Sequence, residues 1–459
     1  MDNKEIDIII NSQKEFNKTN SNSVNYRIQI LNSLLKEIIK TEDKIYEALK
    51  KDLNKHEFES FLSEVLLVKR EIKLFTRKLK KWSKKKKVNG SIFNFPSSDY
   101  LLPEPYGQVL IITPWNYPFQ LSLTPLIGAV GAGNSVIIKP SELAPNTSSV
   151  LKELISSVFP QNLVSVIEGD AETAKYLLDK KWDYILFTGS TRIGKIVAEK
   201  AAKHLTPTTL ELGGKSPCIV DSNIDLDKTA KRIVSGKFVN CGQTCIAPDY
   251  VLVNTHVKSV LISMLKKNII LTFGSTPHDS DSYGRIINKA NLLRLKENLN
   301  NQDIEFGGRI DENNLYIEPT LVIDPDINSE IMKEEIFGPI LPIISYENEN
   351  DLNKILNLNP TPLAFYIFSN NQKFIDKLID SNKFGGCVVN DTLIHYVNSN
   401  LPFGGIGESG MGAYRGKFSF DTFSHYKPVL KKKSMIDIPF RYGPYPNSFK
   451  LIKKLLEKL

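Results

Sequence analysis

The chain has 459 residues, of which 41% are hydrophobic and 24% charged, with a net charge of +8. This balance is typical of a soluble globular protein, and the length predicts two or three domains because it exceeds one ordinary hydrophobic core. Four cysteines argue against a disulfide framework and favour a reducing compartment. The amino terminus lacks the basic start and apolar core of a signal peptide, so we expect a cytoplasmic protein.

The first part of the chain predicts helices, because residues 24 to 81 carry Leu, Ile, Lys and Glu at helical spacing without a proline. A basic run follows, in which eight of the eleven residues from Arg77 to Lys87 are Lys or Arg. Lys431 to Lys433 form a second basic cluster. No stacking-aromatic or groove-reading motif accompanies them, so we expect solvated helix ends and no nucleic-acid partner. Salt-dependent binding to DNA or RNA is the alternative.

A long uncharged stretch, Pro105 to Ile138, could span a membrane on length alone. It contains three further prolines, and its two flanks have the composition of strands. Buried strands of a parallel sheet have continuous apolar sequences of this kind. We therefore expect no stable membrane insertion.

Strands and helices alternate beyond this point. The predicted strands are Gln108 to Ile112, Ser135 to Ile138, Val164 to Ile167 and Tyr184 to Phe187; the predicted helices are Thr147 to Ser157, Glu172 to Asp179 and one that begins near Arg192. This order implies an α/β fold with a doubly wound parallel sheet, which commonly binds a nucleotide at the carboxyl ends of its strands.

The usual dinucleotide fingerprint, G-x-G-x-x-G, is absent from this part of the sequence. The better candidate is the turn from Phe187 to Gly194, where a strand leads through Gly189 and Ser190 into a helix. Backbone amides at the start of that helix could hold a pyrophosphate. Taken alone, this motif is more often an ordinary strand-to-helix turn.

Two loop segments carry the residues best suited to catalysis. Cys245 ends the segment Gly-Gln-Thr-Cys, and Glu211 begins Glu-Leu-Gly-Gly-Lys. A thiol and a separate carboxylate can serve as nucleophile and water-activating base. An isolated cysteine is more often a buried hydrophobe, but the combination favours catalysis. Cys241 precedes Cys245 by four residues, yet no matching His or Cys pair completes a zinc site, so we expect no metal.

Seven motifs in one order resemble the aldehyde dehydrogenase superfamily from about Asp52 to Tyr445. They are Thr-Pro-Trp-Asn-Tyr-Pro (113–118), Lys-Pro-Ser-Glu (139–142), Phe-Thr-Gly-Ser (187–190), Glu-Leu-Gly-Gly-Lys (211–215), Gly-Gln-Thr-Cys (242–245), Glu-Glu-Ile-Phe-Gly-Pro (334–339) and Leu-Pro-Phe-Gly-Gly (401–405). Seven ordered motifs are far more specific than any one of them. The short amino terminus and the segments 181–190, 409–414 and 419–425 resemble the class 3 and fatty-aldehyde dehydrogenase group.

This resemblance implies a division of the chain into structural parts. It predicts a Rossmann-like NAD(P)-binding domain, a second α/β catalytic domain and a small β oligomerisation arm. The corresponding residues are 1–86 and 105–211 for the cofactor domain, 212–423 for the catalytic domain, 87–104 and 424–433 for the arm, and 434–459 for a carboxyl-terminal tail. By resemblance the protein is a homodimer.

The resemblance also implies catalytic roles. Cys245 would attack the aldehyde, and Asn116 would stabilise the oxyanion together with the backbone amide of Cys245. Glu211 would then activate the water that releases the acid. Without the other motifs, Asn116 would be a plain turn asparagine and Glu211 a surface carboxylate. The two glycines after Glu211 instead indicate a close backbone approach.

The remaining implied contacts concern the cofactor and the substrate. Lys139 and Glu142 would meet the adenosine ribose, which favours NAD, with NADP as the alternative. Gly189, Ser190 and Gly194 would lie near the pyrophosphate, and Glu335 and Phe337 at the nicotinamide ribose. A helix-cap glutamate and a core phenylalanine are the structural alternatives for the last two. Tyr117 and Phe403 would line the entrance for a medium-chain, fatty or aromatic aldehyde, although plain packing explains them equally well.

Two other functions fit the same motifs less well. In a coenzyme-A acylating relative a thiol resolves the thioester, but Glu211 favours hydrolysis. A non-catalytic binding protein on this fold would not need nucleophile, base and oxyanion donor together. In the tail, Phe449, Ile452, Leu455, Leu456 and Leu459 form one helical stripe with lysines opposite, which predicts packing on the body or a partner, or weak contact with a membrane surface.

Overall fold

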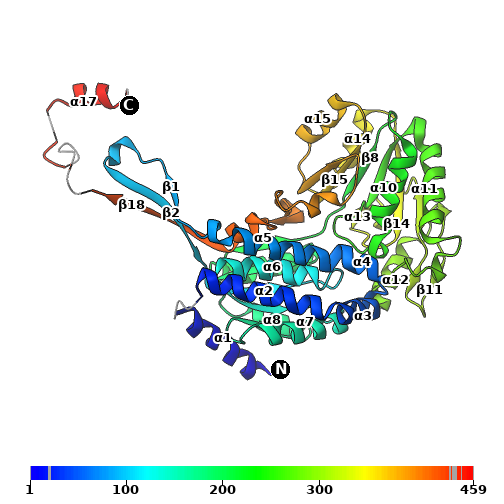
Figure 1. Cartoon of the computed structure of the whole chain (residues 1–459). Coiled ribbons are helices and arrows are strands. Elements are labelled where there is room, and N and C mark those ends of the chain that lie inside the picture. The colour runs from blue at the N-terminus through cyan, green and yellow to red at the C-terminus, as the bar shows by residue number, and fades with distance from the viewer. Residues whose placement is uncertain (1, 19–21, 434–435, 437–441, 446, 458–459) are drawn as a thin grey trace.

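The computed structural model describes residues 2–18, 22–433, 436, 442–445 and 447–457, and it places two α/β units beside a projecting β arm (Figure 1). The amino-terminal segment is helical, as predicted, and the helices begin earlier than expected, at Asn3. They are α1 (Asn3–Lys18), α2 (Val24–Lys40), α3 (Glu42–Leu53), α4 (Glu57–Ser60), the π-helix η1 (Phe61–Val65) and α5 (Leu66–Trp82).

The first sheet has six strands in the order β17-β7-β6-β3-β4-β5, and all neighbours are parallel except β17 and β7. The strands are β3 (Gln108–Ile112), β4 (Ser135–Lys139), β5 (Val164–Val166), β6 (Tyr184–Thr188), β7 (Thr208–Glu211) and β17 (Gly410–Met411). The connecting helices are α6 (Gln120–Ala132), α7 (Pro145–Val158), α8 (Ala171–Leu178) and α9 (Thr191–Ala202). The predicted doubly wound parallel sheet is confirmed.

Helices cover both faces of this sheet. Along β3, Val109 and Ile111 pack into the core formed with α2, α3 and α5 to α7, whereas Leu110 and Ile112 face the core formed with α1, α8 and α9. Successive side chains of a strand point to opposite faces. Because helices cover both faces of this sheet, both sets of side chains are apolar. The uncharged stretch from 105 to 138 therefore supplies two buried strands, as interpreted, while its middle forms the buried helix α6, which the prolines and glycines of the sequence did not predict.

The second sheet has seven strands in the order β10-β13-β14-β9-β8-β15-β16, parallel except at β10. They are β8 (Pro217–Val220), β9 (Tyr250–Asn254), β10 (Ile304–Phe306), β13 (Thr320–Ile323), β14 (Ile340–Tyr346), β15 (Ala364–Phe368) and β16 (Gly386–Val389), with a separate pair β11 (Ile310–Asp311) and β12 (Tyr316–Ile317). The helices are α10 (Leu226–Phe238), α11 (Lys258–Phe273), α12 (Lys289–Asn298), α13 (Glu330–Lys333), α14 (Glu349–Leu356) and α15 (Gln372–Ser381). One continuous core holds this unit together.

After the second sheet the chain returns to the first unit. Strand β17 joins the edge of β7, and α16 (Lys417–Thr422) packs against α6. The approach is close, since a Cβ on Gly128 would lie 2.6 Å from Cβ of Ser419. The segment that completes the first sheet, from β17 to α16, therefore follows the whole second unit in the sequence.

The arm is a three-stranded sheet that extends away from the two units (Figure 1). Strand β2 (Ser97–Pro105) pairs antiparallel with β18 (Ser424–Lys432), and β1 (Lys86–Val88) lies on its other side. The basic run after Arg77 thus passes from the end of α5 into this arm and is not confined to a helix end.

Beyond the arm, α17 (Phe449–Leu456) lies apart from the α/β body (Figure 1). Phe449 and Leu451 are exposed on it. Of the predicted apolar stripe, Leu459 and the side chain of Leu455 lie outside the described residues. No helix in the described part of the chain is long and apolar enough to cross a membrane.

Candidate active site

The three predicted catalytic residues meet at one cleft of about 860 Å³. Asn116 follows β3, Glu211 ends β7, and Cys245 lies in the loop after α10. Strands β7, β6 and β3 are consecutive neighbours in the first sheet, so their carboxyl ends open at the same edge. The second unit brings the loop that carries Cys245, the predicted nucleophile, against that edge. We call this loop the nucleophile loop.

The nucleophile loop has an unusual backbone. Asn240, Cys241 and Gly242 are all left-handed, with φ of 49°, 56° and 75°. A Cβ at Gly242 would lie 2.3 Å from the carbonyl oxygen of Gly338, so this close turn requires glycine. The Gln243 side chain fixes the turn: its Nε2 donates to the Asn240 carbonyl at 3.0 Å, and its Oε1 accepts from the Ile287 amide at 3.0 Å. The Gly-Gln turn therefore delivers Cys245 to the cleft.

Asn116 is tied to this same loop. Its Nδ2 donates to the Gln243 carbonyl at 3.0 Å, and its own carbonyl accepts from Asn240 Nδ2 at 2.9 Å. The side chain is buried and lines the cleft. An amide nitrogen has two hydrogens, so one remains to donate to an oxyanion beside Cys245.

Glu211 is 2% exposed, and neither of its carboxylate oxygens has a hydrogen-bond partner among the described residues. Burial raises the pKa of Glu211 well above its usual range. A buried carboxyl group without a protein partner is unusual and is typical of a functional site. Its unpaired oxygens can accept hydrogen bonds from a water that enters the cleft.

Burial also raises the pKa of the Cys245 thiol, and the charges of Glu335 and Glu211 raise it further. Burial therefore disfavours the thiolate form of Cys245 in this cleft. Attack on a carbonyl requires the thiol to lose its proton as the bond forms, so a proton acceptor must act in the same cleft.

Glu335 lies against the two glycines that follow Glu211, since a Cβ on Gly213 would come within 2.0 Å of its Oε2. Burial raises the pKa of Glu335 well above its usual range, helped by Asp249 and opposed by Lys215. Phe337 is left-handed, with φ of 52°, and its ring meets that of Trp115 edge-on at 5.3 Å. Both predicted nicotinamide-side residues line the cleft.

A buried ion pair that the sequence did not reveal supports this loop. Lys215 Nζ lies 2.5 Å from Asp249 Oδ2 and also donates to the carbonyls of Ile331 and Glu334, at 2.6 and 2.9 Å. Asp249 Oδ1 accepts from the Ile336 amide at 3.0 Å. The only signal in the sequence was that Lys215 closes the Glu-Leu-Gly-Gly-Lys motif and Asp249 follows the cysteine motif by four residues.

Of the three residues predicted to lie near the pyrophosphate, two line the cleft and one permits close helix packing. Gly189 and Ser190 line the cleft, and the Ser190 side chain caps α9 by accepting from the Ile193 amide at 3.5 Å. Gly194 is not among the lining residues: a Cβ there would lie 2.5 Å from the Leu212 side chain, so this glycine permits close packing of α9.

The predicted ribose residues stand at the carboxyl end of β4. Lys139 Nζ lies 3.1 Å from Glu142 Oε2 and donates to the Pro140 carbonyl at 2.8 Å. Neither residue is among those that line the cleft, although β4 is the neighbour of β3 in the sheet. Lys139 is buried, while the Glu142 side chain is 45% exposed and open to a ligand.

The predicted substrate residues also lie outside the lining of this cleft. The Tyr117 hydroxyl is 2.7 Å from Oγ1 of Thr244, the residue before Cys245. Phe403 is buried in an aromatic cluster, with ring centroids 4.7 Å from Tyr396 and 5.9 Å from Tyr414. Tyr117 therefore contacts the loop that carries Cys245, whereas Phe403 packs within the cluster that it forms with Tyr396 and Tyr414.

Comparison with known proteins identifies the fold and the chemistry. Residues 1–429 match the model of the aldehyde dehydrogenase family. The chain belongs to this family. It is 45% identical over 444 residues, 96% of this chain and 97% of the relative, to 4,4'-diaponeurosporen-aldehyde dehydrogenase of Staphylococcus aureus. It is also 44% identical to aldehyde dehydrogenase family 3 member A2 of Rattus norvegicus over 420 residues, which are 92% of this chain and 87% of the relative.

Among solved structures, the substrate-bound state of Staphylococcus aureus AldH superposes with a TM-score of 0.96 at 44% identity, covering 98% of this chain and 99% of that one. The predicted membership of the family and its class 3 branch is confirmed. The protein is thus an NAD(P)-dependent enzyme that oxidises aldehydes to carboxylic acids. Among the residues that the structure describes, no group of His, Cys, Asp or Glu is arranged to hold a metal ion.

Proposed function

We propose that Cys245 is the nucleophile, Asn116 an oxyanion donor and Glu211 the base that activates water, and that the substrates are medium-chain, fatty or aromatic aldehydes. The observation that carries the proposal is the meeting of these three side chains at one cleft, where neither oxygen of Glu211 has a partner in the described part of the chain. The thiol proton of Cys245 passes to water in the cleft as the sulfur forms a bond to the carbonyl carbon, and the resulting oxyanion accepts hydrogen bonds from Asn116 Nδ2 and the Cys245 backbone amide. Glu211 later takes a proton from water, which attacks the thioester and frees the acid and the thiol.

The residues of the cleft fit a nicotinamide dinucleotide. The cleft has a volume of about 860 Å³, and its lining includes Ser190, the N-cap of α9, and the buried Glu335 beside the Gly213 backbone. Backbone amides at a helix start favour phosphate groups. When bound, the nicotinamide accepts the hydride that converts the thiohemiacetal into the thioester. The chain's own residues bind and orient the reactants and move the protons.

We propose NAD as the preferred cofactor, with NADP also accepted. The exposed carboxylate of Glu142 can accept the ribose hydroxyls and repels a 2′-phosphate. The ion pair with Lys139 partly neutralises that repulsion, which leaves room for NADP.

An apolar substrate fits the aromatic residues beside the nucleophile loop. Tyr117 contacts Thr244, and the cluster of Phe403, Tyr396 and Tyr414 lies nearby. Burial raises the pKa of the Tyr414 hydroxyl, and the nearby carboxylate of Glu211 raises it further. The Staphylococcus aureus relative is named 4,4'-diaponeurosporen-aldehyde dehydrogenase, which names an aldehyde as its substrate.

The arm supports a homodimer, and the four free cysteines favour a reducing, cytoplasmic compartment. Strand β18 is an edge strand of the three-stranded sheet, and Ile92, Phe93 and Phe95 on the arm are exposed in the single chain. Exposed edges and apolar side chains of this kind commonly pair with another chain. A second copy would cover them.

The direct test measures reduced nicotinamide formation with hexanal, decanal, hexadecanal and benzaldehyde, using NAD and NADP, with Cys245→Ser as control. Turnover that disappears in Cys245→Ser supports the proposal, and product analysis should give the free acid whether or not coenzyme A is present. Formation of an acyl-coenzyme A in preference to the acid would reject Glu211 as the base. Absence of turnover with every pair would favour a binding protein on this fold.

A further inference from the structure

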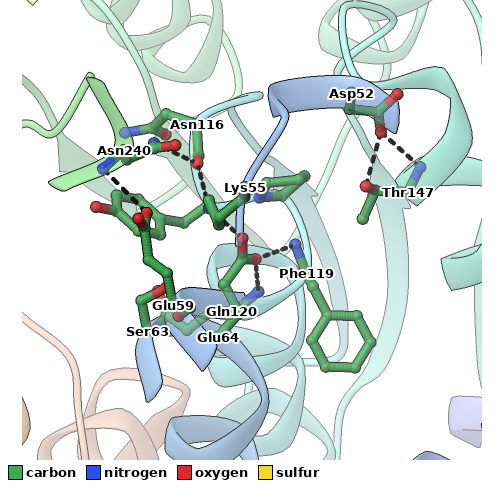
Figure 2. A network of polar contacts seen from close by, with 12 residues as sticks. Asp52, Lys55, Glu59, Ser63, Glu64, Asn116, Phe119, Gln120, Thr147 and Asn240 are labelled. Carbon is green, nitrogen blue, oxygen red and sulfur yellow. Dashed lines mark hydrogen bonds and ion pairs between the residues drawn. The ribbon is translucent and has the colours of Figure 1, made fainter. Parts of the chain in front are cut away.

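A network of buried and half-buried charges lies behind the two catalytic loops, on residues 52–64, and none of these residues lines the cleft (Figure 2). We propose that Lys55, Glu59 and Glu64 are positioning residues that set the distance between the Asn116 amide and the Cys245 loop. The inference rests on the proposed roles of Asn116 and Cys245 and adds residues that act through them.

Lys55 and Glu64 form an ion pair with both side chains fully buried and 2.6 Å between Nζ and Oε1. Each partner also holds the loop that carries Asn116. Lys55 Nζ donates to the Asn116 carbonyl at 3.2 Å, and Glu64 Oε2 accepts from the amides of Phe119 and Gln120, at 2.9 and 3.1 Å. The pair therefore fixes Asn116 itself and the point where α6 begins. A carboxylate at a helix start is also favoured by the helix dipole.

Glu59 holds the other loop. Its Oε1 accepts from the Asn240 amide at 2.9 Å (Figure 2). Asn240 is the first of the three left-handed residues before Cys245, and its side chain donates to the Asn116 carbonyl at 2.9 Å. Glu59, Asn240 and Asn116 thus form one chain of hydrogen bonds between the two loops.

The carbonyl of Asn116 is the point where both branches meet. It accepts from Lys55 Nζ and from Asn240 Nδ2. A displacement of either branch would move the residue whose side-chain amide faces the oxyanion. Lys55 Nζ also lies 4.3 Å from the ring centroid of Tyr117, whose hydroxyl meets Thr244. A second route therefore leads from Lys55 to the residue before the nucleophile.

Stability alone does not require these charges. A buried ion pair is often no more stabilising than well-packed apolar residues of similar size, because both charges lose their hydration. Its advantage is directional: charged groups impose fixed distances on the backbone amides and carbonyls that they bind. The π-helix η1, which carries Glu64, is a type of turn found frequently at functional sites.

The ends of this segment are anchored as well. Asp52 Oδ2 accepts from the amide and the hydroxyl of Thr147, both at 2.7 Å, which joins the segment to the start of α7 (Figure 2). Residues 52–64 therefore connect the first sheet's helices to both catalytic loops.

The test compares Glu59→Ala and Glu59→Gln with the wild-type enzyme, and uses Glu57→Gln as a matched control on the exposed side of the same helix. Active Cys245 is counted by stoichiometric labelling. Reduced nicotinamide formed in a single turnover with NAD and decanal is then expressed per active thiol, and the NAD dissociation constant is measured separately.

We expect Glu59→Ala to lower the rate per active thiol by about 10- to 100-fold, because a small misplacement of reacting groups has effects of this size. The NAD dissociation constant should stay within about twofold, since Glu59 does not line the cleft. Glu59→Gln keeps an acceptor for the Asn240 amide and should recover most of the rate. Glu57→Gln should match the wild type. An unchanged rate per thiol with fewer active thiols would show that Glu59 only supports folding and would overturn the proposal.

Because single substitutions of the buried pair can prevent folding, a second variant replaces both partners, Lys55→Met with Glu64→Met. Removing both charges together leaves no uncompensated charge, so this variant should fold. Its rate per active thiol should also fall about 10-fold or more. A wild-type rate in this folded variant would overturn the role of the pair. An inactive wild type would instead contradict the proposed function, so the two failures are distinguishable.

Discussion

The side-chain amide of Asn116 donates a 3.0 Å hydrogen bond to the carbonyl of Gln243, two residues before Cys245. These residues belong to different units, one after a strand of the first sheet and the other in the loop that leads into the second sheet. The bond orients one amide hydrogen toward Gln243 and leaves the other free. The proposed donor and the proposed nucleophile are thereby held at a fixed distance before an aldehyde binds, as preorganised stabilisation of an oxyanion requires.

Replacing Asn116 with alanine should therefore affect chemistry more than binding. Loss of one oxyanion donor lowers kcat by about 100- to 1,000-fold in comparable sites. We expect the KM for NAD to change little, since the amide does not hold the cofactor in this account. Steady-state kinetics with decanal measure both quantities. A large rise in the NAD KM with an unchanged kcat would assign Asn116 to cofactor binding instead.

Glu211→Gln separates the two halves of the reaction. The variant cannot accept a proton from water, so we expect one burst of reduced nicotinamide per active thiol followed by a steady rate at least about 100-fold below the wild type. Stopped-flow absorbance follows both phases. In the wild type, the thioester-hydrolysis step should accelerate as pH rises, because burial raises the pKa of Glu211 and only the ionised carboxylate is a base. Undiminished steady turnover would reject the assignment.

The stability of the protein should depend on Glu59 in a defined pH window. Burial raises the pKa of Glu59 from 4.5 to about 7, so between these values the folded protein holds a proton that the unfolded chain has lost. The free energy of unfolding contributed by this group therefore decreases as pH rises from about 4.5 to about 7. Glu59→Gln removes this contribution, so the stability of the variant relative to wild type should improve from pH 5 to pH 8. Urea titrations at both values check the sign; a relative stability that falls with pH contradicts it.

The Lys215–Asp249 pair should control the cofactor through the Glu335 loop. Lys215→Met leaves Asp249 as an unpaired buried charge, and we expect a loss of about 3–5 kcal/mol in the free energy of unfolding. Asp249→Asn keeps an oxygen for the Ile336 amide but loses the ion pair. Where either variant folds, the NAD KM should rise while labelling of Cys245 continues. Unchanged stability and an unchanged NAD KM would show that this ion pair does not support the loop.

Weak contact of the tail with membranes is a separate prediction. Phe449 and Leu451 are exposed on α17, and lysines lie on the same helix. An amphipathic basic helix of this kind binds anionic lipid surfaces weakly. The full chain should sediment with anionic vesicles more than a version truncated after Pro446, and the difference should shrink at high salt. Equal recovery of both versions in the supernatant would reject the idea.

The sheet strands were predictable because their chemistry is local. Val109–Ile112 is an uninterrupted apolar run between Gly107 and Pro114, and β3 has the predicted bounds, Gln108–Ile112. The cysteine and glutamate loops were predictable from glycine positions, since Gly213 and Gly242 permit close approaches that other residues would block.

The supporting charges were not predictable for an equally physical reason. Lys55, Glu59 and Glu64 lie in a helical segment whose charged residues look like an ordinary solvated face. Their burial depends on loops that lie 55 to 181 residues away in the sequence. The roles of Gly194 and Phe403 depend in the same way on neighbours that only the tertiary structure brings together.

The most direct test of the central claim is the intact mass of Glu211→Gln after incubation with NAD and decanal. We predict the addition of one decanoyl group to each active protein chain, mapped to Cys245 by peptide analysis, stable for minutes and released by hydroxylamine. The wild type should show little of it because hydrolysis removes the thioester. A variant that oxidises decanal without a covalent adduct, or an adduct on Cys241 or Cys387, would contradict the account.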